Sequence, residues 1–191
     1  MKIKMHLSLL SLVGAVLLFI FTSLAWFSVS DVINIGIFQG KLSNKEIEYV
    51  IYESDDGVTY EEITNISFDI AVPGDVNYYR IILTNPEASD YQVFLVLSGV
   101  RTVLKDGSPY TGSLSMLDVL QLTTTIDSTV IVDDVFSNLY ENQSVTLTTT
   151  FSIESGLSET IDFTFTFLGS AGNEYQNLGV EIDDVLIYFN D

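Results

Sequence analysis

Adjacent acidic residues are the groups in this chain whose types suggest metal binding. Four such pairs occur, at Asp55-Asp56, Glu61-Glu62, Asp133-Asp134 and Asp183-Asp184. Calcium takes about six to eight oxygen ligands, and loop carboxylates supply several of them. Neighbouring residues on a strand point to opposite faces, however, and no Asp-x-Asp-x-Asp-Gly loop occurs. Only Asp55-Asp56 is followed by a glycine, so Asp55 and Asp56 are the calcium candidates, and they suit a hairpin turn equally well.

Side chains for hydrolytic catalysis are scarce. The chain has no cysteine and one histidine, His6, which lies in the leader described below. Zinc-thiolate sites, cysteine nucleophiles and, in the exported chain, mechanisms that need a histidine are therefore excluded. Gly112-Ser113-Leu114-Ser115 does not complete Gly-x-Ser-x-Gly, because Met116 stands where the second glycine belongs. We expect no enzymatic activity, no catalytic residues and no cofactor beyond calcium.

The N-terminus has the three parts of a secretory signal peptide. Lys2, Lys4 and His6 precede the apolar run 7–21, and Ser23 and Ala25 provide the small residues of a cleavage site after Ala25. An uncleaved anchor is the alternative, because residues 7–27 are about as long as a membrane-spanning helix. With either outcome, the rest of the chain is exported to the cell surface or the medium.

The strongly negative net charge limits the classes of molecule that the protein can bind. There are 26 acidic residues against 7 basic ones, and Lys2 and Lys4 would leave with the leader. Nucleic acid is excluded as a partner because phosphate binding needs clustered Lys and Arg. The same charge opposes binding to anionic lipids, so membrane contact is expected only through the leader. Length favours one domain of sufficient size to bury a core without disulfides.

Alternating apolar and polar residues predict strands along the exported chain. In Ile161–Phe167 the four apolar side chains share one face and the polar ones share the other, as a sheet with one wet face requires. Tyr91–Leu97 is apolar on both faces, which is typical of a central strand. Further strands are predicted at Glu46–Ser54, Ile66–Val72, Tyr78–Leu83, Met116–Thr123, Ile126–Val132, Val145–Ile153 and Val180–Phe189. Met116–Leu122 also fits a helical turn, and a register change is expected near Asp183-Asp184.

Turn sequences separate these strands. They include Asp55-Asp56-Gly57, Pro73-Gly74-Asp75 and Asn85-Pro86. Roughly ten strands at this spacing predict an all-β fold, a single β-sandwich or jelly roll. The predicted organisation is a signal peptide at 1–25, an N-terminal strand and linker at 26–45, and a β-sandwich domain at 46–191.

The segment that follows the leader is itself a candidate strand. Val32, Ile33, Ile35 and Ile37 make it apolar, with the three isoleucines on one face and Asn34 and Gly36 on the other. Such a strand can fold back onto its own sheet. It can also add to the sheet of a neighbouring subunit, where backbone pairing and side-chain pockets hold it. Head-to-tail addition of this kind does not close, and it builds a filament.

The sequence resembles the TasA/camelysin group of exported matrix proteins, whose leaders are processed by the signal peptidase SipW. The resemblance rests on the leader end Thr22–Phe27, the alternating strand Val32–Phe38 and a Pro73-Gly74-Asp75 turn before a strand that ends at Thr84-Asn85. It covers the leader and about residues 26–100. Trp26 and Ser28 depart from the residues usual in the group.

The resemblance implies a secreted jelly-roll subunit that polymerises with copies of itself into extracellular or cell-surface fibres of a biofilm matrix. Val32, Ile33, Ile35 and Ile37 would form the donated strand. Accessory matrix proteins and a dedicated signal peptidase are the implied partners. The alternative from the residues alone is a monomeric exported β-sandwich that binds cell-wall glycan or calcium, and the sequence leaves both open.

Overall fold

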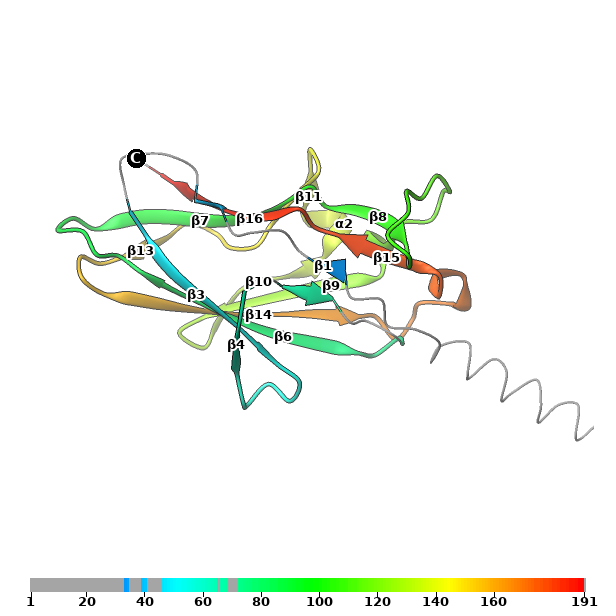
Figure 1. Cartoon of the computed structure of the whole chain (residues 1–191), viewed down its shortest axis with the longest axis horizontal. Coiled ribbons are helices and arrows are strands. Elements are labelled where there is room, and N and C mark those ends of the chain that lie inside the picture. Colours follow the sequence, from blue (N-terminus) through cyan, green and yellow to red (C-terminus); the bar gives the residue numbers. More distant parts are fainter. Residues whose placement is uncertain (1–32, 35–38, 41–45, 65, 69–71, 191) are drawn as a thin grey trace, which may run out of the picture.

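The structure is a computed structural model that describes residues 33–34, 39–40, 46–64, 66–68 and 72–190. Two largely antiparallel sheets lie one above the other and enclose one continuous apolar core (Figure 1). The prediction of an all-β sandwich is confirmed.

The first sheet has six antiparallel strands in the order β10-β9-β14-β6-β3-β4. The alternation of β14 explains its central place: Ile161, Phe163, Phe165 and Phe167 are buried, and the polar residues between them are half-exposed. The residues of β6 and β9 that pair beside these four point their side chains to the same side, and they extend the buried face of the sheet. The strands of this sheet are β3 (Glu48–Ser54), β4 (Glu61–Ile63), β6 (Val76–Thr84), β9 (Leu120–Ile126), β10 (Thr129–Val135) and β14 (Ser158–Phe167).

The second sheet has the order β11-β12-β7-β16-β2, and β13 pairs with β7 beyond β12. Its central strand is β7, as the doubly apolar segment Tyr91–Leu97 predicts. The N-terminal strand β2 runs parallel to β16, whereas the other pairs are antiparallel. The strands are β2 (Gln39–Gly40), β7 (Tyr91–Ser98), β11 (Tyr140–Glu141), β12 (Ser144–Thr146), β13 (Phe151–Ile153) and β16 (Asp184–Phe189).

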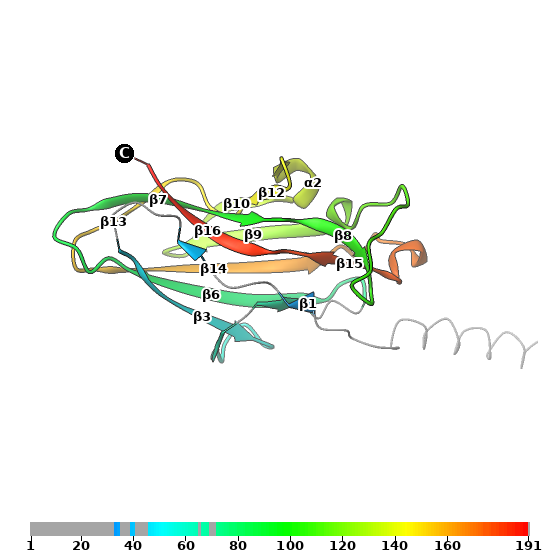
Figure 2. The same ribbon diagram turned by 45° about the horizontal axis from the view of Figure 1, so that its top comes forward.

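Two small ribbons and three short helical turns complete the described part of the chain. β1 (Ile33–Asn34) pairs with β5 (Ser67–Phe68), and β8 (Arg101–Leu104) pairs with β15 (Leu178–Glu181) at one end of the sandwich (Figure 2). The turns are the 3-10 helices η1 (Met116–Asp118) and η2 (Asn173–Tyr175) and the α-helical turn α2 (Phe136–Leu139). None of the helices in these residues is long and apolar enough to cross a membrane.

Aromatic side chains form the centre of the core. The ring of Tyr79 stacks on Phe163 with centroids 5.3 Å apart, and Phe165 meets Phe163 and Phe136 edge to face at 5.4 Å. Phe136 belongs to α2, so this turn is held in place by a fully buried ring. The two sheets are therefore fastened where α2 lies between β10 and β12.

The strand predicted at Val145–Ile153 is divided into β12 and β13. Leu147 N and Thr148 N both donate to Leu95 O, and Leu95 N donates to the Thr148 hydroxyl at 2.8 Å. Two residues are thus inserted relative to β7, since four residues (147–150) lie opposite two (94–95), and a buried side-chain oxygen replaces a backbone carbonyl. The apolar alternation continues through the break, because Val145, Leu147 and Ile153 are all buried.

Three other predicted boundaries need correction. Ile126 ends β9, and Asp127 and Ser128 form a two-residue turn before β10, so the strand predicted at Ile126–Val132 is wrong at its start. Met116–Asp118 is a 3-10 turn capped by Ser115, as the alternative interpretation of that segment expected. Val180–Phe189 is divided at Ile182-Asp183, where the predicted register change sends β15 and β16 to different partners.

Candidate functional site: turns, sheet edges and a seam

The calcium candidates Asp55 and Asp56 lie in the turn between β3 and β4. The Asp56 carboxylate accepts hydrogen bonds from the backbone N–H groups of Val58 and Thr59, both at 2.8 Å, and from the Ser54 hydroxyl at 3.0 Å. Gly57 has a φ of +71°, and its N–H donates to Ser54 Oγ. Asp56 therefore closes the turn, which is the hairpin role that the sequence allowed.

The turn gives Asp56 a pH-dependent contribution to stability. The hydrogen bonds from Thr59, Val58 and Ser54, in that order, lower the pKa of Asp56 from 3.8. A lowered native pKa stabilises the fold above the unfolded-state pKa and is lost as pH falls through the native value. We expect Asp56→Ala to lower the melting temperature at pH 7, and the difference from the parent to shrink below about pH 4. Scanning calorimetry from pH 7 to 2 tests this, and a difference that is constant with pH would contradict it.

A hollow of about 370 Å³ lies beside this turn. It is lined by Ile63 and by the polar or acidic residues Glu53, Ser54, Asp55, Asp56, Thr59 and Glu61. In the described ranges, no three His, Cys, Asp or Glu side chains are grouped so that they could hold a metal ion. Calcium binding at Asp55 and Asp56 stays a prediction from the sequence.

The Pro73-Gly74-Asp75 pattern forms a turn that starts β6. Asp75 Oδ2 accepts from Val72 N at 2.8 Å, and Gly74, with a φ of +100°, donates its N–H to Phe167 O. Asp75 O in turn accepts from Phe167 N. These bonds set the register of β6 against the end of β14.

Asn85 has a corresponding role at the other end of β6. Its side chain is fully buried, and Nδ2 donates to Ser89 O and Ile153 O while Oδ1 accepts from Glu87 N. Its backbone N–H also donates to Leu157 O, and its backbone carbonyl accepts from Gly156 N, both in the β13–β14 turn. The amide joins two turns that are distant in sequence, which is a structural role.

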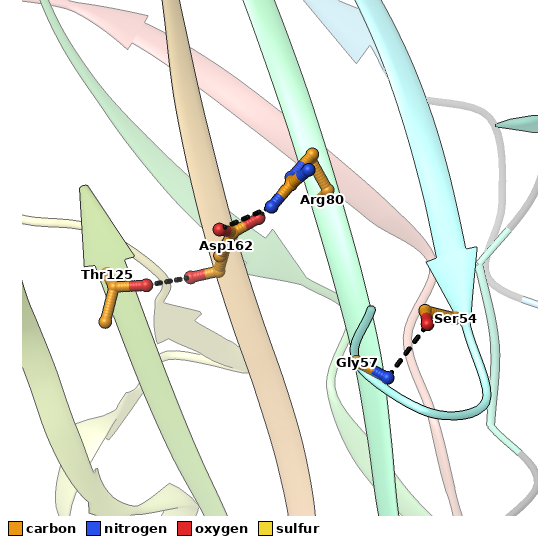
Figure 3. A network of polar contacts seen from close by, with 5 residues as sticks. All are labelled: Ser54, Gly57, Arg80, Thr125 and Asp162. Carbon is orange, nitrogen blue, oxygen red and sulfur yellow. Dashed lines mark hydrogen bonds and ion pairs between the residues drawn. The ribbon is translucent and has the colours of Figure 1, made fainter. Parts of the chain in front are cut away.

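A polar row crosses the outer face of the first sheet (Figure 3). Arg80 Nε and Nη2 donate to the two carboxylate oxygens of Asp162 at 2.6 and 2.9 Å, and Thr125 Oγ1 donates to Asp162 O. The Arg80 guanidinium also lies 4.1 Å from the centroid of the Tyr60 ring, whose pKa burial raises. About a third of each ion-pair side chain is exposed, so the pair contributes at most about 1 kcal/mol. The row fastens the β3–β4 loop to the sheet.

The edge strand of the second sheet is apolar and only partly paired. β16 pairs with β7 along all six of its residues, and among the described residues Gln39 and Gly40 of β2 pair with Leu186 and Ile187 on its other side. Asn190 N donates to Gln92 O, so by alternation the N–H groups of Val185 and Ile187 point away from β7. Charged residues and bulges normally protect an edge, whereas β2 is the strand that pairs with this one in the described part of the chain.

The opposite side of the sandwich has an open seam between the two sheets. In the described part of the chain, β9 is the only strand that pairs with β10, and a bulge between Val130 and Val132 leaves Ile131 unpaired with β9. The seam encloses about 610 Å³ between β10, α2 and the β11–β12 hairpin. It is lined by Ile131, Val132, Asp133, Asp134, Asn138, Leu139, Tyr140, Glu141, Thr146 and Thr149.

The candidate donor residues are only partly covered by the structure. Ile33 lies in β1, where it pairs with Phe68 of the same chain. Val32, Ile35, Ile37 and the cleavage position Ala25 lie outside the described residues. Within a single chain, the described pieces of the N-terminal segment therefore pair with β5 and β16.

Sequence reasoning missed the seam. Its lining combines a strand that alternation does not predict, β11, with the end of β10 and with α2. The only sequence signals are the acidic pair Asp133-Asp134 and the apolar residues Leu139 and Tyr140, which follow it closely. Tyr140 is 38% exposed and Val130 is 56% exposed.

Comparison with known proteins gives no family. No protein-family model matches the chain, and no curated protein matches it. Among solved structures, the sporulation control protein Spo0M of Bacillus subtilis is similar over 78% of this chain, with 13% identity and a TM-score of 0.28. A family 123 glycoside hydrolase from Clostridium perfringens is similar over 76%, with 9% identity and a TM-score of 0.32. The chain spans 48% and 27% of the lengths of these proteins.

Proposed function

We propose that the protein is an exported structural subunit that assembles with copies of itself into extracellular or cell-surface fibres, by donating its N-terminal strand to the next subunit. The observation that carries the proposal is the strand pairing of the described N-terminal residues: Ile33 and Asn34 pair with β5, and Gln39 and Gly40 pair with the edge of β16. A segment whose backbone adds to strands of its own chain has the chemistry to add to a sheet edge of a neighbouring copy.

The sequence and the edges agree with this proposal. The segment that precedes β2 carries the isoleucine alternation of Ile33, Ile35 and Ile37, which suits backbone pairing with an edge. In the described chain the sandwich has two strand edges with unpaired backbone: β2 pairs with two residues of β16, and β10 pairs only with β9. Transfer from one copy to the next gives an open, head-to-tail assembly.

Electron microscopy of residues 26–191 tests the proposal. We expect fibres of regular width at high protein concentration. Added salt should favour them, because the exported chain has 26 acidic against five basic residues and its copies repel one another. A matched chain that lacks residues 26–40 should stay monomeric by analytical ultracentrifugation. Monomers from both chains at all salt levels, or fibres of equal length and yield from both, would overturn the donor role.

A further inference from the structure

The open seam between β10 and the β11–β12 hairpin has the chemistry of a strand-binding groove. Ile131, Val132 and Leu139 give it apolar walls, and Ile131 and Leu139 pack against the core. β10 adds the backbone groups of an edge seven residues long that pairs only with β9 in the described chain. Strand pairing and side-chain pockets are thus present in one place, as recognition of an extended segment requires.

The rim of the seam is negatively charged. Asp133, Asp134 and Glu141 lie along it, and its lining contains no basic residue. Asp133 accepts from Gln121 Nε2 and Thr123 Oγ1, and Asp134 accepts from Asn138 Nδ2 and Val135 N, so their partners are neutral. The bonds from Asn138 and Val135 also lower the pKa of Asp134. The occupant should therefore be apolar, extended and cationic at one end.

Few cations in this protein are available to match that rim. The exported chain has five basic residues: Lys41, Lys45, Arg80, Arg101 and Lys105. Arg80 pairs with Asp162, and Arg101 pairs with Glu181 and Asp183. Lys41 and Lys45 lie three and seven residues after the alternating segment Val32–Phe38, which itself contains no acidic residue. The N-terminal segment is thus the part of the sequence that joins a seven-residue apolar strand to two cations.

We infer that the seam is the acceptor for residues 32–41 of a second copy, with the isoleucines against its apolar walls and Lys41 at the rim formed by Asp133, Asp134 and Glu141. The inference rests on the proposed function and names its acceptor. The competing acceptor is β16, whose edge becomes free when the chain's own Gln39 and Gly40 are donated to the next copy. The acidic rim favours the seam, because residues 185–189 of β16 include no acidic side chain to meet Lys41.

Cysteine cross-linking distinguishes the two acceptors, because the natural chain has no cysteine. One population of full exported chains carries Ile35→Cys, and a second, tagged population carries Tyr140→Cys at the seam. The two are mixed, assembled and oxidised. We expect the cross-linked heterodimer at several times the yield of a matched pair in which the second population carries Val58→Cys, a position 80% exposed on the β3–β4 turn.

A second acceptor population carries Leu186→Cys on β16. Fibres in which Ile35→Cys links to Leu186→Cys, or to neither acceptor, would overturn the seam while leaving the fibre function intact. Absence of fibres from the parent chain would instead overturn the proposed function itself. Fibre formation and the position of the cross-link are measured separately, so failure of the seam is distinguished from failure of the proposed function.

A charge exchange provides an independent measurement that needs no cross-link. Lys41→Glu should slow assembly about five-fold, and Glu141→Lys in the same chain should restore most of the rate. Glu154→Lys is the control: Glu154 is exposed on the β13–β14 turn, away from the seam, and the same change of charge there should restore nothing. Equal rescue by both lysines would mean that only the net charge matters, which contradicts a rim that binds Lys41.

Discussion

Replacing Phe165 with alanine should lower the free energy of unfolding by about 3–5 kcal/mol. Phe165 is fully buried on β14, with Phe136 and Phe163 edge to face at 5.4 Å and Tyr79 at 5.6 Å. Removal of the ring leaves a cavity among rigid aromatic neighbours on β6, β14 and α2, which cannot close it. The loss is large against the roughly 5–15 kcal/mol of a typical domain. Urea denaturation followed by tyrosine fluorescence measures it, since Tyr79 lies beside Phe165.

Phe94 provides the matched control for this substitution. It lies on the outer face of β7, half-buried, and its ring stacks on Tyr188 with centroids 5.1 Å apart. Phe94→Ala removes the same atoms from a surface that water can reach, so we expect a cost of about 1 kcal/mol. Similar costs for the two variants would mean that the Phe136–Phe165–Tyr79 cluster is not the centre of the core.

Alternation predicts this core because it is a local property of each strand. Once β14 has one apolar face, burial of that face decides which way Ile161, Phe163, Phe165 and Phe167 point. The same reasoning predicts the buried faces of Tyr79, Ile81 and Leu83 on β6. The buried face of a strand can therefore be predicted from the sequence without knowing which strands it pairs with.

The tight turns are harder to predict because their residues are unusual. Asp127-Ser128 and Asn142-Gln143 both take two consecutive positive φ angles, between 50° and 63°, as hairpin turns of two residues do. Asn-Gly or Asp-Gly is the common signal for this geometry, and neither stands at these positions. Only the first residue of each pair is a type that tolerates positive φ well. Because the sequence does not reveal the Asp127-Ser128 turn, the predicted strand Ile126–Val132 begins before the observed β10, which starts at Thr129.

The seam is the feature that sequence reasoning could not reach. It exists because β10 and β11 end their respective sheets on the same side, and strand order depends on contacts between distant parts of the chain. Asp133-Asp134 is visible in the sequence as an acidic pair, but nothing local places it beside Leu139 and Tyr140 in an open groove. The turn at Pro73-Gly74-Asp75 is the opposite case, since its residues define it almost alone.

Replacing Ile35 with aspartate should abolish fibre formation. In the proposed assembly this side chain faces apolar walls of the neighbouring subunit, and a buried carboxylate without a partner costs several kcal/mol. The same cost applies at every contact between subunits, so the substitution destabilises the fibre along its whole length. Fibre length and yield by negative-stain electron microscopy, with the sedimentation of unassembled protein, measure the effect.

Asn34→Asp is the control that separates the position of the charge from its presence. Asn34 is the neighbour of Ile35 on the opposite face of the alternating strand, and the substitution adds the same negative charge to the same segment. We expect this variant to form fibres, with at most a modest dependence on salt, while the Ile35→Asp chain remains monomeric at every salt concentration. The melting temperature of both monomers is measured so that unfolding is not mistaken for failed assembly. Loss of fibres from both variants, with recovery in salt, would indicate general repulsion between acidic copies, and undiminished fibres from Ile35→Asp would remove the isoleucine face from the interface.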